Sequence, residues 1–358
     1  MTASSRRAIR TWMFAMCVLV ALTISVGGYV RLVRAGLSIV EWNVVTGVLP
    51  PFSEAAWAGT FAKYKTSPEY RQVNVAMTLP EYKRIYWIEY VHRLIARLVG
   101  LALVVPMAWF LARGIIPRGR AAPFFGIAAL FGVQGFLGWY MVASGLVDQP
   151  SVSHYRLTLH LLVALAILAL CLWIGMDHAA PPGPTEAADR AGDPGLARWL
   201  PSASVALLIA IVLQIAYGGL VAGLKAGHVS NTWPAMFGYV VPPGLLATLQ
   251  PWWRNLVADP TAVHFAHRWW ALAVLALVMT VFAAAWRAGS PPGVRWAAAA
   301  LLGLVGAQIA LGIAVIVWGV PPSVALLHQA MAVAVFAAAV ALVHAASRPH
   351  PPVNAPPT

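Results

Sequence analysis

Cysteine is nearly absent from this sequence. Cys17 and Cys171 are the only two among 358 residues, and both fall inside long apolar runs. No cysteine pair is therefore available for a disulfide in an outer loop, and no CxxCH motif offers covalent attachment of a haem. Charge is scarce as well, because charged residues make up 10% of the chain and hydrophobic residues 60%. This composition excludes a soluble domain of this length.

The apolar runs are long enough to cross a membrane. Each has about 20 or more residues, which matches the thickness of a bilayer. The predicted transmembrane helices are 12–33, 85–111, 122–145, 155–176, 200–223, 264–286, 294–317 and 323–346. We therefore predict an all-α integral membrane protein with eight transmembrane helices.

The arginines lie mostly on one side of the predicted membrane spans. The net charge is +13, and arginines precede the first span, follow the second and the eighth, and lie between spans four and five and spans six and seven. If the spans alternate, these positions share one side, so the positive-inside rule places both termini in the cytoplasm. The outer loop 34–84 also carries Lys and Arg, but long loops cross largely regardless of charge. The charge thus orients the protein in lipid and does not indicate nucleic-acid binding.

The N-terminal residues show neither a small-residue cleavage site nor an amphipathic transit peptide. We therefore expect a bacterial inner membrane rather than an organelle.

The two halves of the chain are copies of one unit. Equivalent polar positions are Glu89, His92 and Arg93 against His264, His267 and Arg268; Gln134 and Gly138 against Gln308 and Gly312; and His160 against His328. Four spans return the chain to its starting side, so the copies are parallel. We predict two tandem four-helix bundles, 1–176 and 199–358, joined by a cytoplasmic linker at 177–198 that is rich in proline and glycine.

Four histidines of this repeat fall at one depth near the outer leaflet. An ionisable ring inside a span is costly and needs a chemical reason. Two facing imidazoles in each bundle are what a bis-histidine haem requires, whereas zinc or a di-metal site would need further ligands that the spans lack. We predict axial pairs of His92 with His160 and of His267 with His328.

Glu89 occupies in the first half the place of His264 in the second. It lies one helical turn before His92, on the same face. It either pairs with a nearby base such as Arg93 or acts as an acid–base group beside one haem only. His264 stays open between packing, proton transfer and hydrogen bonding. Arg93 and Arg268 suit haem propionates or lipid head groups.

Longer motifs resemble one family. GLSIVEWNVVTGVLPP (36–51), EYKRIYWIEYVHR (81–93), GGLVAGLKAGHVSNTWP (218–234) and HFAHRWWA (264–271) are similar to haem A synthases, and the likeness runs along essentially the whole chain. The outer segment FAKYKTSPEY (61–70) resembles the mitochondrial and proteobacterial branch. The resemblance implies an eight-span duplicated bundle that oxidises the C8 methyl of haem O to a formyl group. It does so by successive hydroxylations, which give haem A for terminal oxidases.

The resemblance also implies roles for single residues. The first half would hold the substrate haem on His92 and His160, and the second a haem b cofactor on His267 and His328. Glu89 matches an acidic residue that is important in the family, so it is the expected catalytic residue. Some members carry cysteine pairs in their outer loops, and any thiol role proposed for those members cannot apply here.

The expected partners follow from this reading. They are haem O, a haem O synthase, an electron donor and oxidase assembly factors. The sequence leaves open whether the chain forms a homo-oligomer, and which donor reduces it.

Two other functions fit part of the sequence. A di-haem b electron carrier that exchanges electrons with quinone would need the same four histidines, but it would not need the asymmetry of Glu89 against His264. A transporter also uses parallel repeats, but the spans lack the breaks and midplane charges expected for a substrate path.

Overall fold

The computed structural model describes residues 1–43, 46–147, 149–179 and 192–348. The regular structure of these residues is helical, and eight helices are long and apolar enough to cross a membrane. They are α1 (Ala3–Leu32), α4 (Leu79–Ala112), α5 (Ala122–Ala143), α6 (His154–Asp177), α7 (Pro194–Gly223), α9 (Pro260–Arg287), α10 (Pro292–Val317) and α11 (Pro322–Ala346). The predicted fold class and its eight spans are confirmed.

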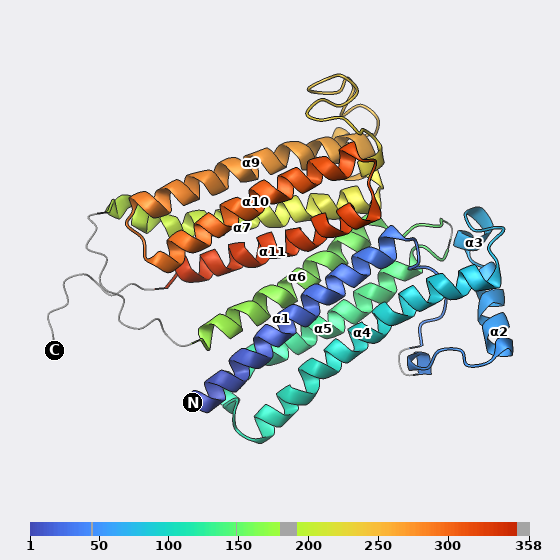
Figure 1. The fold of residues 1–358 in the computed structure, drawn as a ribbon, viewed down its shortest axis with the longest axis horizontal. Helices are drawn as coiled ribbons and strands as arrows, with labels where there is room; N and C mark the ends of the chain where they lie inside the picture. The colour runs from blue at the N-terminus through green and yellow to red at the C-terminus, as the bar shows by residue number, and fades with distance from the viewer. Residues whose placement is uncertain (44–45, 148, 180–191, 349–358) are drawn as a thin grey trace.

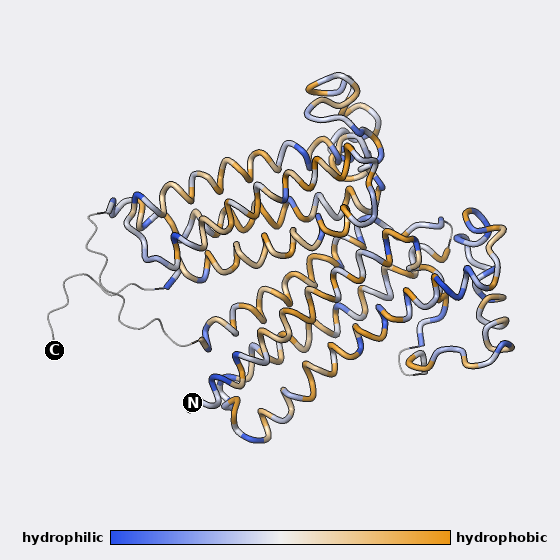
Figure 2. The backbone as a smooth tube through the Cα atoms, in the orientation of Figure 1, coloured by the Kyte–Doolittle hydropathy of each residue, from blue (hydrophilic) through white to orange (hydrophobic). Residues whose placement is uncertain are grey.

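The spanning helices form two groups of four that lie side by side (Figure 1). One group is α1, α4, α5 and α6, and the other is α7, α9, α10 and α11. The groups meet where α1 and α6 pack against α7 and α11. The helices are hydrophobic along most of their length and more hydrophilic toward their ends (Figure 2). The N-terminus and the end of α11 lie at the same end of the molecule (Figure 1).

Proline and aspartate set the starts of the second-half helices. A proline lies in the first turn of each: Pro194, Pro260, Pro292 and Pro322. Proline suits this turn because the first backbone N–H groups have no partner within the helix. The side chains of Asp193 and Asp259 accept backbone N–H bonds at the starts of α7 and α9. Helix α7 therefore begins inside the predicted linker 177–198, of which residues 180–191 lie outside the described part.

The outer segment 34–84 is more than a loop. It contains α2 (Glu54–Lys65) and α3 (Pro68–Gln72), and α4 begins at Leu79. Aromatic side chains pack α2 onto the first turns of α4: Trp57, Phe61, Tyr64, Tyr82, Tyr86 and Tyr90. This aromatic cluster fixes the outer segment over the end of the first bundle.

Each bundle has an apolar core. On α4 and α9 the first buried core residues beyond the histidines are Val99 and Val274, seven residues after His92 and His267 respectively, or about 10 Å along the helix. Partly buried Ile95 and Trp270 pack against these cores three residues after the histidines, so apolar packing reaches the helical turn next to each ring.

Candidate functional site

The first histidine pair joins two helices of the first bundle. His92 on α4 lies within electrostatic range of His160 on α6. Each ring lies against a glycine of a third or fourth helix. A Cβ on Gly27 of α1 would be 3.0 Å from Nε2 of His92, and one on Gly138 of α5 would be 3.3 Å from Cε1 of His160. A side chain in place of Gly27 or Gly138 would therefore narrow the space around the two imidazoles.

The second pair repeats this arrangement. His267 on α9 lies within electrostatic range of His328 on α11. A Cβ on Gly218 of α7 would be 3.3 Å from Cε1 of His267, and one on Gly312 of α10 would be 3.0 Å from Cε1 of His328. In both halves, each histidine ring of the pair therefore lies against a glycine of a neighbouring helix.

Glutamine amides contact three of the four rings. Nε2 of Gln134 lies 3.3 Å from Nε2 of His160 and donates to the His160 carbonyl at 3.1 Å. Nε2 of Gln214 lies 3.2 Å from Nδ1 of His267 and donates to the His267 carbonyl at 3.1 Å. Nε2 of Gln308 lies 3.3 Å from Nε2 of His328.

These residues fit two bis-histidine haems. Nδ1 of His160 and Nδ1 of His328 are buried without a hydrogen-bond partner, an arrangement that costs free energy unless a ligand supplies one. Among the described residues no group of three or more His, Cys, Asp and Glu side chains is placed to hold a metal ion. Two nitrogens in each half, with glycines beside them, suit a flat iron macrocycle with two axial ligands.

Glu89 accepts hydrogen bonds on both carboxylate oxygens and is 2% exposed. Oε2 accepts from the Ser38 backbone N–H at 2.8 Å, the Ser38 hydroxyl at 2.7 Å and the Ile39 N–H at 2.9 Å. Oε1 accepts from Nε of Arg93 at 2.9 Å and from its Nη2 at 2.5 Å. The pairing of Glu89 with Arg93, one of the two alternatives open from the sequence, is therefore present.

Arg93 extends the same contact network to the outer segment. Its Nη2 donates to the Ile39 carbonyl at 2.9 Å and its Nη1 to the Glu41 carbonyl at 3.1 Å. The guanidinium also lies over the Trp42 ring, 4.9 Å from its centroid. Glu89 and Arg93 together hold residues 38–42 beside the first histidine pair.

Arg268 does the same in the second half. Its Nε donates to Nε2 of His264 at 3.1 Å, so His264 is a hydrogen-bond partner, one of the roles left open by the sequence. Its Nη groups donate to the Ser230 carbonyl at 2.8 Å and the Thr232 carbonyl at 2.7 Å. Trp233 lies beside the guanidinium, as Trp42 does in the first half.

Both arginines are thus held inside the protein rather than extended toward lipid head groups. Arg268 is 5% exposed, and the side chain of Arg93 is 11% exposed. Contact of Arg93 and Arg268 with haem propionates stays a prediction.

Contacts between the halves were not apparent from the sequence. Nε2 of Gln329 on α11 donates to the Ile24 carbonyl of α1 at 2.8 Å. Its amide lies against Gly28, where a Cβ would overlap it. Gly219 of α7 lies in the same way against Thr158 of α6, where a Cβ would be 2.7 Å from Oγ1. The signal that could have found these contacts is the Gly-Gly pair in the last two turns of both α1 and α7.

Charged groups of both halves also meet at the C-terminal ends of α1 and α7. Arg34 and Lys225 follow these helices with positive φ angles of 56° and 54°. Burial and the neighbouring charge of Arg34 lower the pKa of Lys225, while Glu69 acts in the opposite direction. Glu69 is buried and lies 3.2 Å from the Arg34 guanidinium.

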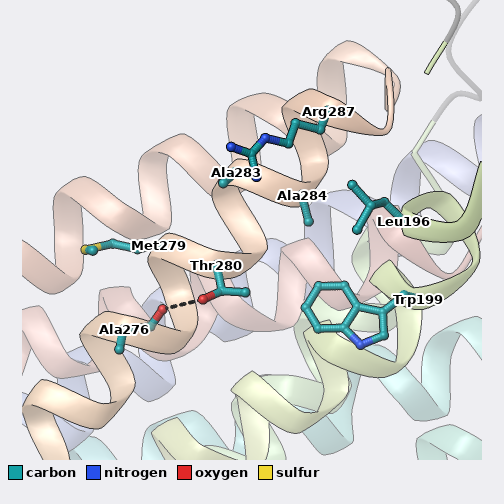
Figure 3. A pocket seen from close by; sticks show the side chains of 8 residues that line it. All are labelled: Leu196, Trp199, Ala276, Met279, Thr280, Ala283, Ala284 and Arg287. Carbon is teal, nitrogen blue, oxygen red and sulfur yellow. Dashed lines mark hydrogen bonds between the residues drawn. The ribbon is translucent and has the colours of Figure 1, made fainter. Parts of the chain in front are cut away.

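A shallow cleft of about 690 Å³ lies elsewhere, between α7 and α9 (Figure 3). Its residues come from the first turns of α7 and the last turns of α9, as Trp199 and Arg287 show. Its first α9 residue, Ala276, is nine residues beyond His267, about 13 Å along the helix. The cleft is therefore separate from the histidine pairs.

Comparisons with known proteins identify close relatives along nearly the whole chain. Residues 10–340 match the family described as cytochrome oxidase assembly protein. A haem A synthase of Sphingopyxis alaskensis is 42% identical over 95% of this chain and 92% of its own length. Haem A synthases of Rhodopseudomonas palustris and Nitrosospira multiformis are each 41% identical, over 96% and 95% of this chain and 91% and 93% of their own lengths.

Proposed function

The chain belongs to the cytochrome oxidase assembly family that includes these haem A synthases, and from that premise we propose how its two histidine pairs convert haem O to haem A. The protein is a membrane-bound oxidoreductase with haem O as substrate and haem A as product. The reaction oxidises the C8 methyl of haem O to a formyl group by successive hydroxylations. The observation that carries the proposal is the pair of imidazoles in each half, which lie within electrostatic range of one another and each against a glycine.

We assign the substrate to the first half. His92 and His160 hold the iron of haem O, and His267 and His328 hold haem b. The asymmetry of the halves supports this order, since a buried carboxylate, Glu89, lies one turn from His92. The corresponding position near His267 carries the imidazole of His264 instead.

When bound, haem b supplies one-electron transfer to the substrate site. The chain would supply position, because two histidines would hold each haem and the glycines beside their rings leave space that a larger residue would narrow. Glu89 and Arg93 hold residues 38–42 beside the site. Glu89 is the proposed catalytic residue. A proton would move through its Oε2, which accepts a hydrogen bond from the Ser38 hydroxyl at 2.7 Å. Arg93 and Arg268 have N–H groups left over for haem propionates.

The proposal also includes the orientation of the protein in the membrane and its partner proteins. Both termini face the cytoplasm, and the protein resides in a bacterial inner membrane, as the arginine distribution supports. A haem O synthase would deliver the substrate, an electron donor would reduce the haem b, and oxidase assembly factors would receive the product.

Haem extraction from the purified protein tests the proposal. We would produce the full chain in a host with and without a haem O synthase and identify the bound haems by chromatography. The proposal predicts haem b alone in the plain host, joined by haem O and haem A when haem O is supplied. Haem b in both halves regardless of haem O supply would contradict it and leave the di-haem electron carrier.

A further inference from the structure

The four histidine rings share one structural motif with a single exception. Each ring lies against a glycine, and the residue four positions before that glycine lies on the same face of the same helix. That residue is Gln134 for His160, Gln214 for His267, Gln308 for His328 and Thr23 for His92. Three positions therefore carry a carboxamide, and one carries a hydroxyl.

Thr23 does not take over the role of the glutamines. Its hydroxyl donates to the Leu19 carbonyl of its own helix at 2.8 Å. In the described part of the chain the ring of His92 has Gly27 beside it, and the ring nitrogen there faces no amide. The other three rings each have a glutamine Nε2 within 3.2–3.3 Å of a ring nitrogen.

The glutamines also have an unused acceptor. Oε1 of Gln134, Gln214 and Gln308 is buried without a hydrogen-bond partner. An imidazole that binds iron through one nitrogen carries a proton on the other, and that N–H needs an acceptor. A half-turn of the terminal amide brings Oε1 to the ring nitrogen that Nε2 now faces, and in Gln134 and Gln214 it gives up the bond from Nε2 to the histidine's own carbonyl in exchange for the bond from the ring N–H.

We propose that Gln134, Gln214 and Gln308 are positioning residues that accept the second N–H of three iron-bound histidines, and that Thr23 leaves His92 as the releasable ligand. In the second site both histidines, His267 and His328, have such a glutamine, whereas in the first site only His160 has one. This inference rests on the proposed function, because a first-half haem that is substrate must enter and its product must leave. A cofactor in the second half must instead stay bound.

Haem exchange tests the inference without haem A formation. The purified full-length protein, produced in a host that supplies haem O so that both halves are loaded, is mixed with excess apomyoglobin, and haem transfer is followed by absorbance. Loss of a partner to a metal-bound histidine typically costs about 10–100-fold in affinity. We expect a fast phase from the first half and a slow phase from the second, with His328→Ala removing the slow phase.

Exchanging the residues should exchange the rates. Thr23→Gln should slow the fast phase by about tenfold, and Gln308→Thr should speed the slow phase by about tenfold. Thr23→Val, which keeps the shape and adds no acceptor, is the matched control and should leave the fast phase unchanged. Equal phases in the wild type, or no change in either exchange variant, would overturn the inference.

The reduction potential gives a second readout that a structural role would not move. An accepted N–H makes an imidazole a stronger donor to iron, so Gln214→Leu should raise the potential of the second-half haem. An unchanged potential with haem still bound would contradict the role of Gln214. If the exchange rates follow the glutamines but no haem A is made, the role of the glutamines is confirmed and the proposed function is wrong.

Discussion

At the scale of single residues, Glu89 combines two duties. All five of its contacts come from donors, which is the environment of a carboxylate, and three of them come from the outer segment. Its proposed proton chemistry is therefore tied to the position of residues 38–42. A change at Glu89 should affect the reaction before it affects haem binding, since the four histidines do not depend on it.

Replacement of Glu89 tests this duty. Glu89→Ala should leave both haems bound and lower haem A formation by about 100-fold or more, as expected for loss of an acid–base group. Glu89→Gln should retain acceptance from Ser38 but lose the charge that pairs with Arg93, and should also be inactive. The measurement is the ratio of haem A to haem O in protein purified from a host that makes haem O.

Glu41 offers a matched control in the same outer segment. Its side chain is 49% exposed and pairs with Lys63, while only its backbone carbonyl contacts Arg93. Glu41→Gln should make normal haem A. Normal haem A from Glu89→Ala would show that this carboxylate is not catalytic.

The sequence predicted the individual histidines but not the contacts that position them. His92, His160, His267 and His328 could be found because the repeat places them at equivalent depths. The arginine contacts could not, since Ile39 and Ser230 belong to irregular segments of different length whose register follows from folding alone. Thr23 gave no signal either, because its meaning depends on three glutamines on other helices.

At the scale of helices, the contact of α1 with α11 depends on Gly28. Gln329 bonds the Ile24 carbonyl at 2.8 Å, and its amide fills the space where a larger residue 28 would extend. Gly28→Ala should displace the Gln329 amide and break its bond to the Ile24 carbonyl, at a cost of about 1–3 kcal/mol in the free energy of unfolding. Thermal unfolding of the purified protein in detergent measures the loss.

Gly100 on α4 is the control for helix propensity. A Cβ there would meet nothing within 4 Å, so Gly100→Ala should be neutral or slightly stabilising. If Gly28→Ala unfolds at the same temperature as Gly100→Ala, the packing described for α1 and α11 is incorrect.

The sequence predicted the helices that cross the membrane but not the short ones outside it. Spans such as α5 and α10 need long apolar runs, so their positions followed from hydropathy to within a few residues. Helices α2 and α3 did not follow, because they are short and depend on the aromatic cluster with α4 for their stability.

At the scale of the whole molecule, the two halves meet at the level of their histidines. Gly27 faces His92 while Gly28 meets Gln329, which directly follows His328. In the second half Gly218 faces His267 while Gly219 meets Thr158, two residues before His160. Each Gly-Gly pair thus lies between a histidine of its own half and the ligand helix of the other. This arrangement supports electron exchange between the two proposed haems.

The halves are also joined at the opposite end, where the N-terminus and the end of α11 lie. Nε2 of His344 on α11 lies 2.9 Å from the carboxylate of Asp177 at the end of α6. His344 is buried, and its ring packs edge-on against Trp173. The duplicated bundle is therefore held together at both levels, which keeps the spacing of the two sites fixed.

The haem content of histidine variants in each half decides whether substrate and cofactor occupy separate halves. His160→Ala and His328→Ala would be purified from a host that supplies haem O, and their haems extracted and identified. We expect His160→Ala to keep haem b but lose haem O and haem A, and His328→Ala to lose haem b and keep unconverted haem O. Loss of the same haem from both variants would contradict the assignment of substrate and cofactor to separate halves.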